Sequence, residues 1–334
     1  MKQVSVTEIS SWKSCRLYHS FSYDRALVPL KPSIGPLWFG TGIHVALATY
    51  YKYGTPPLDN WNIWYESELA STFSESRVTE ERDRLENFNQ LGRSMMSMYL
   101  TYAQANDGWE VVDVEKPITY EVIPGLVELK GSLDLLVRKS GKLWIVDHKT
   151  CSSFIDPEQL VFDPQMAYYL WLVWKVYGEV PGGAIYSMLR KAIPAEPMLV
   201  YNNTALSKAK GIDTTVEKYL EAIRRNGFNE ADYSEVLKRI EKNEFFRRET
   251  VVRSARELKV FDQQILDELT EMTRPYLPIY PTPTRDCVWA CGYSDLCRTR
   301  LTGGDVEFTI QANYREASND ERFNQRWLEP STTE

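Results

Sequence analysis

The chain has 334 residues, of which 43% are hydrophobic and 25% charged, and its formal net charge is −7. These values are typical of a globular protein with a substantial core, and they exclude a generally basic nucleic-acid-binding surface, although a local basic groove stays compatible with them. No run of about 18 apolar residues is present, which excludes a membrane-spanning helix. The N-terminus, Met1 to Val6, lacks the apolar region of a secretory signal, so we expect a cytoplasmic protein.

The N-terminal third is predicted to be helical. Residues Ser5 to Glu8 form a capping box, and the helix that it opens ends near Cys15. A second helix is predicted after the Pro/Gly-rich loop 29–36, and residues from about 65 to 105 have the pattern of a polar amphipathic helix.

Two glycines, Gly40 and Gly42, lie at the predicted start of the second helix, where they permit a close backbone approach. His44 follows on the same helix. A histidine on an apolar helical face is most often a hydrogen-bonded core residue, so the pattern alone assigns no function to it.

Two segments in the middle of the chain, residues 129–137 and 143–150, predict a β-hairpin with a tight turn between them. Asp134 lies on the first strand, and Asp147 and Lys149 lie near the end of the second. Because residues i and i+2 of a strand point to the same side, Asp147 and Lys149 should face one cleft, and Asp134 can join them from the neighbouring strand.

Two carboxylates and an ammonium group are suited to Mg²⁺- or Mn²⁺-assisted hydrolysis of a phosphodiester. A surface salt bridge is the commoner meaning of Asp-x-Lys at a strand end. The nuclease interpretation is favoured because an apolar strand, Leu143 to Val146, carries these charges at its carboxyl end.

Further along, Asp163 and Pro164 provide an N-cap and a first helical residue for a helix that ends at Gly178. Gln165 and Tyr169 share one face of that helix, either as part of the site or as the polar edge of a core helix.

A short strand is predicted next, at 184–189, and residues from about 205 to 275 are predicted to be a helical insertion. The basic stretch Lys238 to Lys259 is interleaved with glutamates and predicts a salt-bridged helix face. A proline-rich break then leads to a cysteine segment at 285–300, and residues 303–334 are predicted to be a loosely held polar tail.

Three cysteines, Cys287, Cys291 and Cys297, fall within eleven residues. Clustered thiols in a cytoplasmic chain bind metal more often than they form disulfides, and both zinc and iron–sulfur clusters accept thiolates. Cys15 is the expected fourth ligand, because its terminal helix is free to close against this segment, whereas Cys151 is expected to be a bystander. Three unrelated thiols are the alternative, and the spacing alone leaves zinc and iron–sulfur open.

The order of these motifs resembles the RecB-like iron–sulfur exonuclease branch of the PD-(D/E)XK nuclease superfamily. The order comprises Cys15, Gly40-Thr-Gly-Ile-His44, Gly131-Ser-Leu-Asp134, Asp147-His-Lys149, Gln165-x3-Tyr169, Cys287, Cys291 and Cys297. In motif layout it is similar to CRISPR-associated exonucleases, the AddB nuclease domain and phage relatives. The likeness spans about Ser5 to Arg298.

The resemblance implies an α+β restriction-endonuclease-like core over residues 1–302, with a mixed central sheet flanked by helices and a C-terminal segment stapled by an iron–sulfur cluster. It also implies a role for each motif residue. His44, Asp134 and Asp147 would bind Mg²⁺ or Mn²⁺, Lys149 would activate water, and Gln165 and Tyr169 would contact DNA and support the lysine. Cys15, Cys287, Cys291 and Cys297 would hold a [4Fe–4S] cluster, with zinc as the other occupant.

The expected function is metal-dependent exonucleolytic cleavage of DNA ends in recombination, repair or end processing, in a bacterial or phage-infected cell. Recombination, repair or CRISPR adaptation proteins are the partners that the resemblance implies, and an oligomer is compatible with it. Two departures from the usual family pattern are Asp147, where many relatives carry Glu, and the three residues between Cys287 and Cys291, where two are usual. The alternative is a DNA-end-binding or partner-docking module with a vestigial site.

Overall fold

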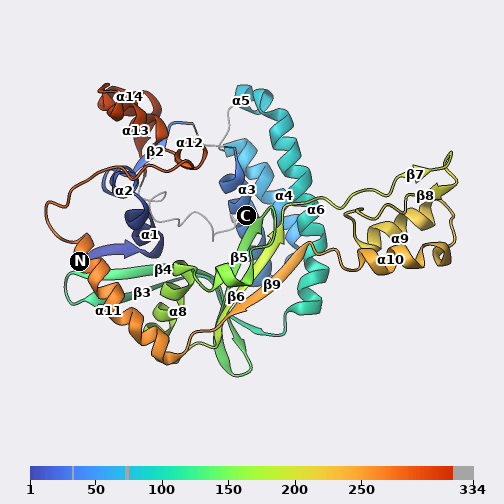
Figure 1. Cartoon of the computed structure of the whole chain (residues 1–334), viewed down its shortest axis with the longest axis horizontal. Helices are drawn as coiled ribbons and strands as arrows, with labels where there is room; N and C mark the ends of the chain where they lie inside the picture. Colours follow the sequence, from blue (N-terminus) through green and yellow to red (C-terminus); the bar gives the residue numbers. More distant parts are fainter. Residues whose placement is uncertain (32–33, 72–74, 319–334) are drawn as a thin grey trace, which may run out of the picture.

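The computed structural model describes residues 1–31, 34–71 and 75–318, and its centre is a six-stranded mixed sheet (Figure 1). The strands of this sheet are β1 (Lys2–Ser5), β3 (Glu110–Ile123), β4 (Val127–Lys139), β5 (Lys142–Cys151), β6 (Gly183–Arg190) and β9 (Phe246–Val251). They lie in the order β1-β4-β5-β6-β9, and β3 also pairs with β4. β1 runs parallel to β4 and β5 parallel to β6, while the other pairs are antiparallel. The predicted mixed sheet and the hairpin are confirmed.

Helices surround this sheet. The N-terminal half contributes α1 (Val6–Ser14), α2 (Arg16–His19), α3 (Pro36–Tyr53), α4 (Pro57–Ser71), α5 (Glu75–Glu80) and α6 (Arg82–Asn106). The C-terminal half contributes α7 (Pro157–Leu160), α8 (Pro164–Tyr177), α9 (Val216–Arg225), α10 (Ser234–Ile240), α11 (Ala255–Met272), α12 (Cys287–Ala290), α13 (Ser294–Leu301) and α14 (Val306–Asn313). Within the described part of the chain, no helix is long and apolar enough to cross a membrane.

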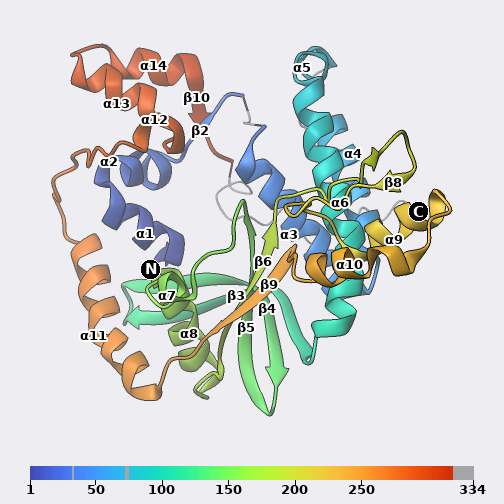
Figure 2. The same cartoon turned by 45° about the vertical axis from the view of Figure 1, so that its right-hand side comes forward.

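Two apolar cores hold the helices against the sheet. The larger core joins α1, α8 and α11 to the sheet through buried residues such as Leu129, Ile145 and Leu172. The second core holds α3, α4 and α6 together around Trp61 and Tyr99. Figure 2 shows α8 and α11 on one side of the sheet and α3, α4 and α6 on the other.

Two different strands, β1 and β5, pair with one edge of β4. Its first residues, Val127 to Lys130, pair with β1, whereas Leu135 to Lys139 pair with β5. Residues 131–134 therefore lie where the two neighbouring strands diverge, and backbone groups near this point need partners other than a strand. This gap determines where Asp134 lies.

Residues 205–275 are not wholly helical, which corrects the sequence prediction. The range contains β9, which pairs antiparallel with β6 and forms an edge of the sheet. Its sequence, Phe-Arg-Arg-Glu-Thr-Val, is rich in charge, which an edge strand tolerates but which hides the alternation of a strand. The helices of this range are α9, α10 and α11, of which α11 packs on the sheet. α9 and α10 pack with the hairpin of β7 (Leu199–Val200) and β8 (Ala205–Leu206) around a small separate core. Figure 1 shows this unit projecting away from the sheet.

The segment after Gly303 is also more ordered than the sequence prediction of a loose tail. α14 is capped by Asp305 and is followed by β10 (Tyr314–Glu316), which pairs antiparallel with β2 (Leu27–Pro29). Buried Ile310 and Tyr314 anchor it to residues near the N-terminus. Residues 319–334 of the predicted tail lie outside the described residues.

Candidate active site

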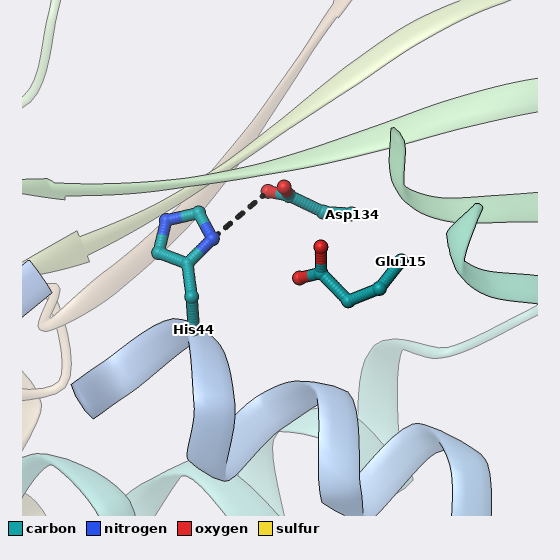
Figure 3. A group of neighbouring side chains, drawn as sticks. All are labelled: His44, Glu115 and Asp134. Atoms are coloured by element: carbon teal, nitrogen blue, oxygen red, sulfur yellow. Dashed lines mark ion pairs between the residues drawn. The ribbon is translucent and has the colours of Figure 1, made fainter. Parts of the chain in front are cut away.

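His44 reaches the sheet from α3, a helix that begins with Pro36 at its first turn and ends at Gly54 in a left-handed cap. The predicted start at Gly40 was therefore about one turn late. Gly42 instead lets the helix approach Trp64, because a Cβ atom there would lie 2.1 Å from the indole ring. The Nδ1 atom of His44 is 3.4 Å from Oδ2 of Asp134 (Figure 3).

Asp134 lies in the stretch of β4 between the part paired with β1 and the part paired with β5. Its side chain accepts a backbone hydrogen bond that a strand partner would otherwise accept. Its Oδ2 atom accepts a hydrogen bond of 2.7 Å from the backbone N–H of His148 on β5. The carboxylate is thus held between α3 and β5, and the hairpin predicted its place beside β5 but not its contact with α3.

Glu115 completes a group of three possible metal ligands and was missed by sequence reasoning. Ligand atoms of His44, Glu115 and Asp134 all lie within 4.8 Å of one another, and Figure 3 shows both carboxylates on the same side of His44. The register of β3 with β4 puts Glu115 opposite Asp134. The turn signal Pro124-Gly125 could have revealed this pairing, since it makes β3 and β4 a hairpin.

The charges of this group are strongly coupled. Burial raises the pKa of Glu115 to about 8, and Asp134 adds to the effect while His44 opposes it. Burial alone would lower the pKa of His44, but Asp134 outweighs burial and raises it to about 9. The same pairing with His44 outweighs burial and lowers the pKa of Asp134. The Asp134 carboxylate, the His44 imidazolium and a Glu115 carboxyl group that resists ionisation therefore share a desolvated pocket.

Asp147 and Lys149 lie beside this group on β5, as predicted. Lys149 Nζ donates to Oδ1 of Asp147 at 3.1 Å and lies 2.9 Å from Oδ2. The Oδ2 atom is buried and accepts no hydrogen bond, so it can bind a further partner. Burial raises the pKa of Asp147 to about 6, which Lys149 partly offsets. Asp147 outweighs burial at the lysine and raises the pKa of Lys149.

Gln165 and Tyr169 approach the lysine from α8. The Oε1 atom of Gln165 accepts from Lys149 Nζ at 3.3 Å, and its Nε2 atom donates to the Tyr169 hydroxyl at 3.2 Å. Asp163 caps this helix by accepting from the N–H of Gln165 at 2.9 Å, and it is held by the Tyr186 hydroxyl at 3.0 Å. A chain of hydrogen bonds thus runs from β6 through the helix cap to the lysine.

His148 points to the opposite side of β5, as its place between Asp147 and Lys149 predicted. Its ring stacks on Tyr51 and meets Tyr99 edge-on, and both ring nitrogens are buried without a hydrogen bond. Burial lowers its pKa to about 3, so the ring is neutral. It packs α3 and α6 against the sheet.

Four of the five cysteines line a single cavity of about 230 Å³, namely Cys15, Cys287, Cys291 and Cys297. Cys15 follows α1 and caps α2, and it shares the cavity with Cys287 of α12 and Cys297 of α13. Cys151 lies apart from them, with its thiol 3.7 Å from the carbonyl oxygen of Leu189. Among the described residues, no three sulfur atoms approach one another within 4.8 Å.

The donor set beside α3 fits a hard divalent cation. Carboxylate oxygens are preferred by Mg²⁺ and Mn²⁺, and one imidazole nitrogen is compatible with Mn²⁺. A cation would also offset the repulsion between Glu115, Asp134 and Asp147 that contributes to the raised pKa of Glu115. With a lysine in contact with Asp147, the arrangement can bind a phosphate ester and polarise it.

Comparison with known proteins identifies the family of this chain. The sequence matches the family description PD-(D/E)XK nuclease superfamily over residues 3–298. Among solved structures, SSO0001 is 13% identical over 90% of this chain and 87% of its own, with a TM-score of 0.31. A protein from Eubacterium rectale named as a candidate exonuclease is 13% identical over 87% of this chain and 93% of its own, with a TM-score of 0.39. None of the curated proteins that were compared matches the sequence. Because the family match covers nearly the whole chain, the protein belongs to the PD-(D/E)XK nuclease superfamily.

Proposed function

We propose that the protein is a Mg²⁺- or Mn²⁺-dependent DNA exonuclease of the RecB-like branch that processes DNA ends in recombination or repair. The observation that carries the proposal is the grouping of His44, Glu115 and Asp134 within 4.8 Å, beside the ion pair of Lys149 and Asp147. The preference for DNA ends rests on the resemblance in motif order.

In this proposal, His44, Glu115 and Asp134 hold the cation, and Asp147 is the fourth candidate ligand through its Oδ2 atom, which has no hydrogen bond. A bound divalent cation would lower the pKa of water and neutralise charge on the phosphate. Lys149 would donate a hydrogen bond to the attacking water or to a phosphate oxygen. Gln165 and Asp147 would hold its ammonium group in place, because both already contact Nζ.

The test is cleavage of end-labelled linear DNA, single- and double-stranded, beside a closed circle, with Mn²⁺ or with EDTA. We expect Mn²⁺-dependent loss of linear DNA while the circle is spared, and the labelled end reports the polarity. Lys149→Ala should lower the rate about 100-fold or more, as expected for the loss of a charged group at the reacting phosphate. Lys142→Ala is the matched control, since Lys142 is an exposed lysine at the start of the same strand. Cleavage by Lys149→Ala at the wild-type rate would exclude this assignment.

A DNA-end-binding or docking module with a vestigial site is the second candidate. It would bind DNA and show no dependence on Mg²⁺ or Mn²⁺ for any activity. The burial of Asp134, Asp147 and Glu115 argues against this candidate. Burying ionisable groups together costs folding free energy, and a site without a function gives no reason to keep them.

We further propose that Cys15, Cys287, Cys291 and Cys297 hold a [4Fe–4S] cluster. Backbone N–H groups already point at two of the sulfurs: Thr282 and Tyr18 donate to Cys15 at 3.4 and 3.5 Å, and Thr284 donates to Cys287 at 3.3 Å. Such hydrogen bonds stabilise thiolate ligands. A single tetrahedral zinc ion would hold its sulfurs about 3.8 Å apart, whereas the cavity of about 230 Å³ between the four thiols has room for a larger group.

Metal and sulfide analysis of anaerobically purified wild-type protein tests the cluster. Iron and acid-labile sulfide in equal amounts, with visible thiolate–iron absorbance, are expected. Serine substitution at any of the four cysteines should lower the iron content, whereas Cys151→Ser should leave it unchanged. Stoichiometric zinc without iron in the wild-type protein would refute the cluster whatever the variants do.

A further inference from the structure

An exposed aromatic residue lies on the short helix between two of the clustered cysteines. Trp289 is 78% exposed and its neighbour Val288 is 80% exposed, although both are large apolar side chains. Trp289 is not among the residues that line the cysteine cavity, whereas Val288 lines it together with Cys287 and Cys291. A large indole left in water contributes nothing to the core, so its exposure calls for a partner.

Three arginines lie on or next to the same two short helices. Arg285 precedes α12 by two residues, and Arg298 and Arg300 lie on α13. All three are exposed, and within residues 1–31, 34–71 and 75–318 none of them forms an ion pair.

The two helices present these groups at one place. Val288 from α12 and Arg298 and Leu301 from α13 line the same cavity, and Leu301 is 69% exposed. Figures 1 and 2 both show α12 directly beside α13, at the end of the molecule opposite the projecting insertion. We call Arg285, Val288, Trp289, Arg298, Arg300 and Leu301 the α12–α13 surface.

We propose that the α12–α13 surface binds single-stranded DNA, with a base stacked on Trp289 and phosphates held by Arg298 and Arg300. This proposal rests on the proposed function for its choice of DNA as the polyanion. An exposed indole next to free guanidinium groups is the combination that binds unpaired strands, since stacking needs a base face and arginine forms paired hydrogen bonds to phosphate. In a duplex the base faces are covered by their neighbours, so stacking on Trp289 favours an unpaired strand.

Charge complementarity favours a polyanion over a protein partner. The chain carries a net charge of −7, whereas the α12–α13 surface carries three exposed arginines beside one exposed carboxylate, Asp286. A protein contact would instead be expected to carry a buried apolar centre with few free charges. The surface has apolar residues only at Val288, Trp289 and Leu301, between the arginines.

The experiment measures binding of a short labelled oligothymidylate and of a labelled hairpin duplex by fluorescence anisotropy in EDTA. Chelation prevents cleavage, so the readout does not depend on nuclease activity. Trp289→Ala should raise the Kd for the single strand roughly 5- to 150-fold, because base–aromatic stacking contributes about 1–3 kcal/mol. The Kd for the duplex should change less than about twofold if stacking is the interaction lost.

A second variant tests the arginines. Removing both Arg298 and Arg300 by alanine substitution should lower the slope of log K against log salt by about 1.4 for the single strand, since each phosphate contact contributes about 0.7. Arg256→Ala, an exposed arginine on α11, and Tyr276→Ala, a fully exposed aromatic, are matched controls and should leave both quantities unchanged. Iron content and visible absorbance equal to the wild type show that the variants keep the cysteine segment folded.

Unchanged single-strand affinity in Trp289→Ala, or an equal loss on the duplex, would overturn the proposal. So would a change in sedimentation of Trp289→Ala without a change in DNA binding, because it would identify a protein contact. If binding follows these expectations but the wild-type protein shows no Mn²⁺-dependent cleavage, the proposed DNA-binding role of the α12–α13 surface is kept. The nuclease proposal is then rejected.

Discussion

Glu115 adopts a backbone conformation that glutamate rarely takes, with a φ of 48° within a β-strand. A left-handed residue of this kind costs about 1 kcal/mol or more, and such strain is usually kept where a side chain must point in one direction. Here the direction is toward Asp134 and His44. The proposed metal site therefore depends on a residue whose backbone is held against its preference.

We expect Glu115→Gln to weaken Mn²⁺ binding at least about tenfold and to raise the Mn²⁺ concentration needed for cleavage, because the amide keeps the shape and removes the charge. Calorimetric Mn²⁺ titration and the metal dependence of the cleavage rate measure both effects. Glu110→Gln is the control, since Glu110 is exposed on the same strand. An unchanged Mn²⁺ requirement in Glu115→Gln would remove Glu115 from the ligand set.

At the scale of elements, the packing of α8 on β4 decides whether Gln165 reaches Lys149. Gly131 makes this packing close: a Cβ atom there would lie 2.9 Å from Leu172 Cδ1 and 3.0 Å from the Tyr169 ring. The same Tyr169 ring carries the hydroxyl that accepts from Gln165. This close packing explains why glycine stands at the first position of the Gly131-Ser-Leu-Asp134 motif.

Gly131→Ala should push α8 outward, lowering stability by about 1–3 kcal/mol and lowering kcat further by misplacing Gln165. Gly211→Ala is the matched control, because a Cβ atom at Gly211 would meet nothing within 4 Å. Thermal unfolding and single-turnover cleavage separate the two effects. Identical behaviour of the two variants in both measurements would show that the close approach is unimportant.

At the scale of the whole molecule, residues 17–29 and residues 293–316 form one unit. Leu17, Phe21 and Leu27 pack with Tyr293, Leu296, Ile310 and Tyr314, and β10 pairs with β2. The Tyr293 hydroxyl donates to the Leu27 carbonyl at 2.6 Å. This unit has its own small core, separate from the two cores that hold helices on the sheet.

Tyr314→Ala should therefore loosen both ends together while the sheet stays protected. Removing a buried aromatic costs about 3–5 kcal/mol, and we expect faster amide hydrogen exchange in residues 15–29 and 287–316 but not in β4 or β5. Phe308→Ala, at a 69% exposed site on α14, should change neither region. Faster exchange confined to residues 287–316 would mean that the two ends are held independently.

The sequence by itself was sufficient for the hairpin of β4 and β5, the mixed sheet with flanking helices, and the motif residues that the structure brings together around Lys149. These follow from local patterns, since alternation, turn residues and caps act over a few positions. Only the tertiary structure decided the place of Glu115, the strand β9 and the ordered segment α14–β10. β9 and β10 depend on partners distant in sequence, β6 and β2, whereas the place of Glu115 depends on the register of the β3–β4 hairpin. A charged strand such as β9 has no local signal, because the sheet edge on which it pairs is what makes it a strand.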